Sequence, residues 1–319
     1  MIFTTLKGAA IDFAGQRDSE QLLGSPTALW KMTLSRLIRR KSGIVGIVLV
    51  GGMTLVALAA PLIAPYDPQQ VLIGIEDVKK RSAPCIHALG CDETKPQHIL
   101  GLDGNVRDLF SRIIYGARVS LSIGFTTVTF AVFFGVSLGA IAGYVGGWID
   151  NVIMRIMDVI LGFPALLLAI AIVAVLGPGL RNALLAIAIV TLPAYARVMR
   201  ASVLSIKELD YVAASRALGA SSTRILLVRV LPNAMTPVVV LATLGVAGAI
   251  LDAAGLSFLG LGAQPPTPEW GTMLGTERNQ VFSAPHLVFF PGIAIMITVL
   301  GFNLLGDGLR DALDPRLND

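Results

Sequence analysis

The sequence predicts an all-α membrane protein with about six transmembrane helices. Of its 319 residues, 54% are hydrophobic and only 14% are charged, against about 25% charged in an average soluble protein. Long stretches carry no Asp, Glu, Lys or Arg; they cover residues 42–66, 119–149, 159–180, 230–251 and 279–306. Each is long enough for a helix that crosses a hydrocarbon core, which needs about 20 residues. A soluble protein with so few polar residues could not bury five such helices.

Six spans follow from these stretches. We place them at residues 43–64, 119–143, 155–176, 182–200, 235–260 and 286–306. The fourth has the shortest neutral core and is interrupted by Pro193, which a span tolerates when neighbours satisfy the freed carbonyl. In the second, Gly135, Gly139 and Gly143 recur every four residues on one face. Because small residues let helices approach closely in lipid, they predict a helix-packing face.

Basic residues predict the orientation. A cluster without acidic residues precedes the first span: Lys31, Arg36, Arg39, Arg40 and Lys41. By the positive-inside rule, residues 1–42 are then cytoplasmic. Six spans return the tail, residues 307–319, to the cytoplasm, and residues 65–118 become an extracytoplasmic segment. The remaining five spans lie in a core of residues 119–306.

Just before the first span, apolar side chains recur at helical spacing between the basic ones: Trp30, Leu34, Leu37 and Ile38. This pattern is typical of an amphipathic helix lying along the inner membrane surface. An ordinary basic flank that only sets the topology explains it equally well.

Motifs for catalysis are missing from the sequence. There is no G-x-x-x-x-G-K-[ST] phosphate loop, so the chain is not expected to hydrolyse ATP. Its three histidines give no basis for a catalytic triad. Among the span residues, Asp158 and Asp252 stand out, because an acid inside a membrane is a functional candidate by default. Both lie near predicted span ends, which favours a hydrated or helix-capping role over proton coupling.

The loop between the fourth and fifth spans, residues 201–233, predicts a docking element. Residues 210–218 suit a short helix rich in small side chains, and Gly219 ends it. Ser221 or Ser222 then caps a second helix over residues 223–231, which Pro232 ends. A small-residue surface beside Tyr211 and Arg216 is one that another protein can approach closely.

This loop resembles the cytoplasmic "EAA" loop of binding-protein-dependent ABC importer permeases. Ala213-Ala214-Ser215 stand where that family has E-A-A, without its glutamate. Gly219 matches the family's glycine, and Val230-Leu231-Pro232-Asn233 matches the closing segment.

Further segments resemble the C-type subunits of the dipeptide/oligopeptide permease group. The similar stretches are residues 60–68, 98–121, 256–262, 268–271 and 306–316. In the second of them, the group's G-T-D and G-R-D appear as Gly101-Leu102-Asp103 and Val106-Arg107-Asp108.

The resemblance implies a type I ABC importer permease fold in the plasma membrane of a bacterium or archaeon. A homologous B-type permease would complete the pore, and two ABC ATPase subunits would bind ATP and Mg²⁺, so this chain needs no cofactor. An extracellular binding protein would deliver a di- or oligopeptide. The contact with an ATPase would fall on a coupling helix with these residues: Asp210, Tyr211, Ala213, Ala214, Ser215, Arg216, Leu218 and Gly219. Alternatively, Tyr211 and Arg216 only stabilise the loop.

Two cysteines, Cys85 and Cys91, lie close together in the extracytoplasmic segment. A structural disulfide is the favoured interpretation, since that compartment permits one. With His87 and His98 they could instead form a metal site, and two free thiols are a third alternative. No resident metal is expected in the favoured interpretation.

Other cargoes and functions stay open. The same architecture could import nickel complexes, glutathione or oligosaccharides. A secondary carrier or channel acting alone would need its own ion-coupling groups and no docking loop. A membrane anchor or sensor would need no polar route between the spans. No nucleic-acid partner is expected.

Overall fold

The computed structural model describes residues 26–313, with the backbone alone for residues 26–32. Within this range the regular elements are helices, and no β-strand occurs beyond three isolated bridges. The first 25 residues of the predicted cytoplasmic segment, the side chain of Trp30 and residues 314–319 of the predicted tail lie outside the described part. Of the described helices, five could cross a membrane, and the bent pair α6 and α7 adds a sixth if it is one span.

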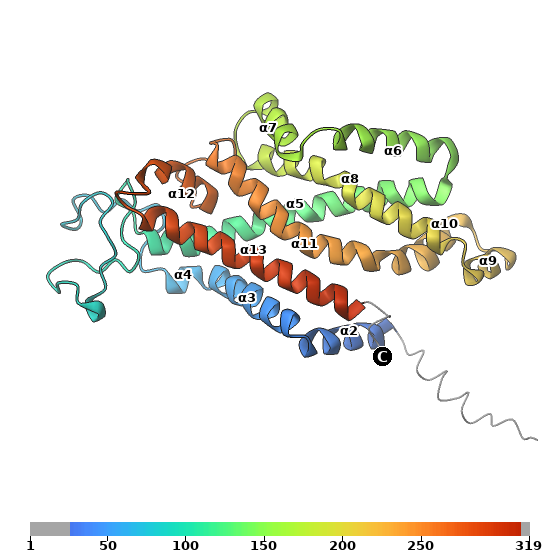
Figure 1. The fold of residues 1–319 in the computed structure, drawn as a ribbon, viewed down its shortest axis with the longest axis horizontal. Coiled ribbons are helices and arrows are strands. Elements are labelled where there is room, and N and C mark those ends of the chain that lie inside the picture. The colour runs from blue at the N-terminus through green and yellow to red at the C-terminus, as the bar shows by residue number, and fades with distance from the viewer. Residues whose placement is uncertain (1–25, 314–319) are drawn as a thin grey trace, which may run out of the picture.

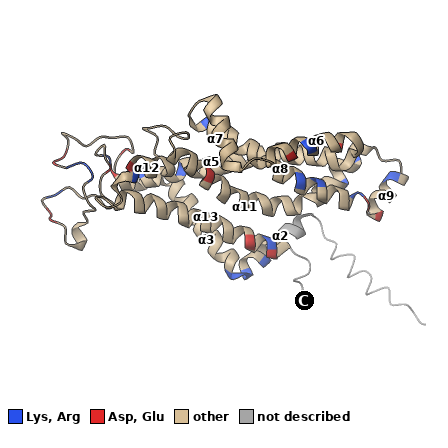
Figure 2. Ribbon diagram, turned by 45° about the horizontal axis from the view of Figure 1, so that its top comes forward, with Lys and Arg blue, Asp and Glu red and all other residues tan. Residues whose placement is uncertain are grey.

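The helices run largely side by side along the length of the molecule (Figure 1). In chain order they are α2 (Pro26–Arg39), α3 (Lys41–Leu58), α4 (Ala60–Ile63), η1 (His87–Leu89), α5 (Leu109–Val145), α6 (Gly147–Leu161), α7 (Ala165–Leu176), α8 (Leu180–Ile206), α9 (Asp210–Ala217), α10 (Ser222–Arg224), η2 (Ile225–Val230), α11 (Leu231–Phe258), α12 (Trp270–Glu277), η3 (Arg278–Gln280) and α13 (His286–Leu313). On the ribbon, charged residues are few along the middle stretches of α3, α11 and α13 (Figure 2).

Helix α5 begins ten residues before the second predicted span. Asp108 caps it, because its carboxylate accepts a hydrogen bond from the Ser111 N–H at 2.8 Å. The hydropathy pattern missed this start since Arg112 and Arg118 lie in the first turns. The irregular segment that was predicted to be external therefore ends at residue 108 instead of 118.

The third predicted span is broken. Helices α6 and α7 meet at an angle of 92° around residues 162–164. Pro164 explains the break, because proline has no N–H and disfavours the helical conformation in the residue before it. By contrast, α8 continues through Pro193 over its full 27 residues.

The sequence predicted that Pro232 ends a helix, and this prediction is wrong. α10, η2 and α11 form one 37-residue run from Ser222 to Phe258. η2 is π-helical, and Pro232 falls in the first turn of α11 directly after it. The change of hydrogen-bond pattern at that point accommodates a residue without an N–H.

The core forms where α5 packs along α8 and where α3 packs along α13. At the second contact, Gly46 of α3 lies against the backbone of Leu304 and Leu305. Such close approach without bulky side chains is how spans associate in lipid, where no hydrophobic force drives them together.

Candidate functional site

Helix α9 lies at one end of the molecule, between the long helices α8 and α11 (Figure 1). It is eight residues long and stops at a glycine, as the sequence predicted. The Gly219 N–H donates to the Arg216 carbonyl at 3.0 Å, and the Ala220 N–H donates to the Ser215 carbonyl at 3.2 Å. Gly219 has a φ of +80°, the left-handed conformation that this helix ending requires.

Two side chains of α9 pack or hydrogen-bond against the rest of the molecule. Val212 is fully buried. The Tyr211 hydroxyl donates to the Arg229 carbonyl at 3.4 Å and accepts from the Asn233 amide at 3.3 Å. Tyr211 therefore stabilises the loop, as one alternative held, although two fifths of the residue stays exposed.

The outer side of α9 is open and carries most of the predicted contact residues. Those exposed are Asp210, Ala213, Ala214, Arg216, Leu218 and Gly219, whereas Ser215 is half-buried. The Ser215 hydroxyl donates to the Tyr211 carbonyl at 2.8 Å. Leu218 is 88% exposed, although its side chain is wholly apolar. An open surface of small side chains with one apolar projection suits a protein partner.

The spans next to α9 are tied together by charged groups. Arg200 of α8 binds both carboxylate oxygens of Asp150 on α6, at 2.5 and 2.6 Å. The Lys207 ammonium, at the end of α8, donates to the Gly143 carbonyl of α5 at 3.0 Å. These two interactions join α8 to α6 and to α5 at the end of α8 that leads into α9.

The three glycines predicted to pack lie where α5 meets α8. A methyl group on Gly139 would collide with the Ala196 carbonyl. One on Gly135 would lie 2.7 Å from the Tyr195 Cβ, and one on Gly143 would lie 2.9 Å from the Arg200 carbonyl oxygen. No larger residue fits unless the helices move apart.

The two acids singled out in the spans have different environments. Asp158 of α6 pairs with Arg197 of α8 at 2.6 Å, and both side chains are half exposed. Asp252 of α11 has no such partner among the described residues. It lies six residues before the end of α11 and caps no helix, so of the two roles expected from the sequence, a hydrated side chain or a helix cap, only the hydrated one stays a prediction for it.

At the opposite end, a buried histidine joins α5 to the segment predicted to be external. The His98 ring contacts the Asp108 carboxylate at 3.1 Å and the Glu76 carboxylate at 3.0 Å. Burial lowers the pKa of His98, but these two hydrogen bonds outweigh it and leave the pKa raised. Tyr66 donates to Glu76 at 3.0 Å, and burial followed by this bond raises the pKa of Tyr66 to about 12.

Further ion pairs stabilise the segment predicted to be external, and one of them holds it against α12. Arg81 pairs with Glu277 at 3.0 Å, and Glu277 also accepts from the Gly104 N–H at 3.0 Å. Arg107 pairs with Asp103 at 2.7 Å. Val106, which lies between Asp103 and Arg107 in the sequence, has a φ of +59°. The group that the sequence resembles has glycine at this position. Sequence reasoning missed these contacts because the partners are far apart or follow no periodic pattern.

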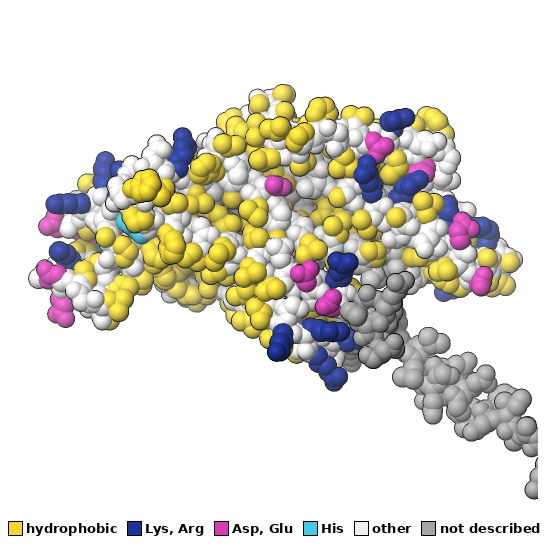
Figure 3. Space-filling view, viewed as in Figure 1, with side chains coloured by type: hydrophobic (Ala, Val, Ile, Leu, Met, Phe, Trp, Pro, Cys, Tyr) yellow, Lys and Arg dark blue, Asp and Glu magenta, His cyan; other side chains and the backbone are white. Residues whose placement is uncertain are grey.

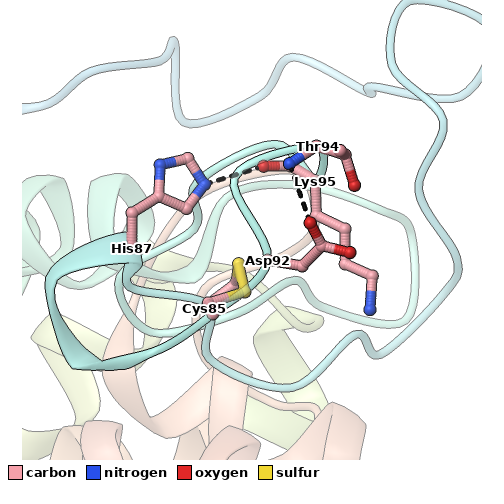
Figure 4. The surroundings of a disulfide bond; sticks show 6 residues. Cys85, His87, Asp92, Thr94 and Lys95 are labelled. Atoms are coloured by element: carbon pink, nitrogen blue, oxygen red, sulfur yellow. Dashed lines mark hydrogen bonds between the residues drawn. A yellow bond between two sulfur atoms is a disulfide. The ribbon is translucent and has the colours of Figure 1, made fainter.

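Cys85 and Cys91 form a disulfide, with their Cα atoms 5.4 Å apart (Figure 4). The His87 ring contacts the backbone and not the cysteines, with its Nε2 atom 2.8 Å from the Lys95 carbonyl oxygen. Since His98 is engaged by two carboxylates, the mixed sulfur–nitrogen metal site is not assembled. Within the described residues, no group of three or more His, Cys, Asp or Glu could hold a metal ion.

Two models of known protein families match this chain, one over its N-terminal part and one over its C-terminal part. Residues 135–319 match the family described as "Binding-protein-dependent transport system inner membrane component". The chain belongs to this family. Residues 28–84 of this permease also match "N-terminal TM domain of oligopeptide transport permease C". The resemblance predicted from the α9 loop is thereby confirmed.

Curated relatives cover most of the permease. It is 47% identical to "Dipeptide transport system permease protein DppC" of Alkalihalophilus pseudofirmus, over 90% of each chain. It is 49% identical to "Di/tripeptide transport system permease protein DppC" of Pseudomonas aeruginosa, over 82% of this chain and 84% of the relative. It is also 50% identical to "Glutathione transport system permease protein GsiD" of Pectobacterium atrosepticum, over 69% and 73% respectively.

Among solved structures, the permease resembles a chain of "Inward facing conformations of the MetNI methionine ABC transporter". The TM-score is 0.53 at 19% identity, covering 64% of this permease and 97% of that chain. This likeness shows the fold, and the predicted type I ABC importer permease fold is confirmed.

Proposed function

We propose that this permease is the C-type membrane subunit of an ATP-driven importer of di- or oligopeptides. Two relatives that match over at least four fifths of the chain are named as dipeptide or di/tripeptide permeases, and these names support this cargo. The exposed helix α9 supports the energy source, because a chain without a phosphate loop needs a partner that hydrolyses ATP.

In this proposal, α9 lies in a groove on one of two ATPase subunits, which bind ATP and Mg²⁺. Residues 207–209 connect α9 along the chain to α8, and residues 218–221 connect it to α10. Tyr211 also holds α9 to Arg229 of η2 and Asn233 of α11. Closure of the ATPases would move α9 as a rigid body and draw α8 and α11 with it. The ATPases then bias an equilibrium between inward- and outward-facing arrangements, and this chain supplies half of the element that switches.

The two ends of the molecule would face different compartments. The disulfide suits an extracytoplasmic segment, and the basic residues around α2 suit the cytoplasmic side. A B-type permease would complete the pore in a bacterial or archaeal plasma membrane. A binding protein would deliver peptide at the disulfide-bearing end.

Glutathione is a second candidate cargo, because a relative named as a glutathione permease is 50% identical over 69% of this chain. Glutathione is itself a tripeptide, so the two cargoes share a free amino group and carboxylates. Nickel complexes and oligosaccharides have no comparable observation in their favour.

Reconstitution in lipid vesicles tests the proposal. The chain is assembled with its B-type partner, two ATPases and the binding protein, and uptake of radiolabelled dialanine is measured. Uptake that requires ATP supports a peptide importer. Uptake of glutathione without dialanine would change the cargo, and uptake by this chain alone without ATP would replace the importer with a carrier or channel.

A further inference from the structure

Asp252 is a carboxylate without a partner inside a membrane-spanning helix. It is half-buried on α11, six residues and therefore about 9 Å from the helix end at Phe258. No described residue donates a hydrogen bond to it or pairs with it. Asp150 and Asp158 of α6 each bind an arginine instead.

The face of α11 around Asp252 is open. Gly248 lies one turn before it and Gly255 nearly one turn after it, so all three share a face. A methyl group added to Gly248 would meet nothing within 4 Å, and one added to Gly255 would meet only Leu166 of α7, at 3.9 Å. The neighbouring Ala253 is buried. The carboxylate is thus flanked by backbone that a ligand can approach closely.

This face cannot be covered by lipid. An ionised side chain turned towards hydrocarbon is costly, and such residues face a bundle interior or a water-filled cavity. Figure 3 shows few charged side chains across the central part of this face, whereas others gather at the left and right ends and at the lower edge over α2 and the end of α13. An ionised carboxylate left unpaired in that region needs water, a cation or a hydrogen-bond donor from another chain.

We propose that Asp252 lies on the wall of the cargo path and binds the ammonium group of a passing peptide. The inference rests on the proposed function and names the chemistry that the path recognises. Peptides of different sequence share a free amino end, which is largely protonated at neutral pH because its ordinary pKa is about 8. A path with otherwise neutral walls can bind that shared amino end through one carboxylate, without selecting among the side chains of the peptide.

The first experiment tests whether Asp252 faces water. The two native cysteines are joined in a disulfide and no other exists, so an Asp252→Cys variant carries one free thiol. In the assembled transporter, we expect a water-soluble, membrane-impermeant thiol reagent to label it at least about tenfold faster than an Ala253→Cys variant. Ala253 is the matched control because it lies at the same depth but is buried. Equal, slow labelling of both variants overturns the proposal.

The second experiment tests the role of the charge. Asp252→Asn keeps the shape and removes the charge, whereas Asp252→Glu keeps the charge. We expect ATP-dependent uptake of dialanine, below saturation, to fall about tenfold or more with Asn and to be largely retained with Glu. ATP hydrolysis stimulated by the binding protein should persist in both, which a misfolded variant would not allow. Unchanged uptake with Asn, or equal loss with both, contradicts the proposal.

The two arms separate the inference from the proposed function. If the unchanged transporter imports no dialanine, the proposed function fails. The labelling arm still decides whether Asp252 lies on an aqueous path.

Discussion

Individual glycines determine how closely the helices of this permease pack. A Gly139→Ala variant would place a methyl group against the Ala196 carbonyl of α8. We expect it to lower the free energy of unfolding by about 1–3 kcal/mol, because an overpacked contact forces the backbones apart. Thermal unfolding of the purified protein in detergent measures this loss.

Gly51→Ala is the control, since a methyl group there would meet nothing within 4 Å. It should be neutral or stabilise α3 by up to about 1 kcal/mol, because glycine is unfavourable inside a helix. Equal effects of the two changes would show that the contact of α5 with α8 is not tight.

We expect His98 to make the stability of the segment before α5, predicted to be external, depend on pH. Its pKa is raised in the folded protein, because its hydrogen bonds to Asp108 and Glu76 outweigh the effect of burial. The contribution of protonated His98 is therefore complete below its ordinary pKa of about 6.5 and is lost as the pH rises through the raised value. We expect the midpoint of thermal unfolding to fall above pH 6.5. A His98→Gln variant that keeps the same fall would contradict this assignment.

The sequence indicated the glycines and not the histidine network. Gly135, Gly139 and Gly143 repeat at helical spacing, so their shared face follows from helix geometry. The partners of His98 lie 22 and 10 residues away in irregular backbone. Such contacts depend on a tertiary arrangement that no local pattern encodes.

Helix α9 is expected to bind an ATPase through its exposed side. A Leu218→Asp variant places a charge at a position that is 88% exposed, so the stability of the chain itself should change by less than about 0.5 kcal/mol. We expect the ATPases to be lost when the transporter is purified through this chain. Quantitative protein gels of the purified complex measure their ratio to the permease.

Leu89→Asp is the matched control, because Leu89 is 82% exposed at the disulfide-bearing end. It should retain both ATPases. A Leu218→Asp variant that retains them equally would mean that α9 is not the docking element.

Hydropathy predicted the existence of the long helices more accurately than it predicted their first and last residues. The start of α5 depends on the Asp108 cap, which lies in a polar stretch that hydropathy assigns to the loop. The break between α6 and α7 coincides with Gly162 and Pro164, a pair of residues that signals a break in the sequence itself. The continuation through Pro232 was not foreseeable, because it depends on the π-helical turn of η2.

The permease as a whole has two chemically different ends, and we expect them to lie on opposite sides of the membrane. Phe282 is 99% exposed near the disulfide-bearing end, and Leu218 projects from α9. In right-side-out vesicles, an impermeant thiol reagent should label a Phe282→Cys variant and spare a Leu218→Cys variant until the vesicles are opened. The reverse pattern would invert the topology that the basic residues predict.

The fold and family could be predicted from the sequence, because hydropathy and the α9 loop are local patterns. The cargo path could not. In the proposed importer its walls would come from two subunits. An open face such as that around Asp252 emerges only once α11 is placed against its neighbours. Asp158 and Asp252 were equivalent candidates until the structure paired the first with Arg197.

Transport by the reconstituted complex, with the unchanged chain and the Leu218→Asp variant side by side, is the decisive measurement. ATP-dependent uptake of dialanine is followed in vesicles that contain the B-type permease, both ATPases and the binding protein. We predict uptake with the unchanged chain only when ATP is present, and almost none with the variant. Uptake that proceeds without ATP, or at the same rate with Leu218→Asp, would contradict an importer driven through α9.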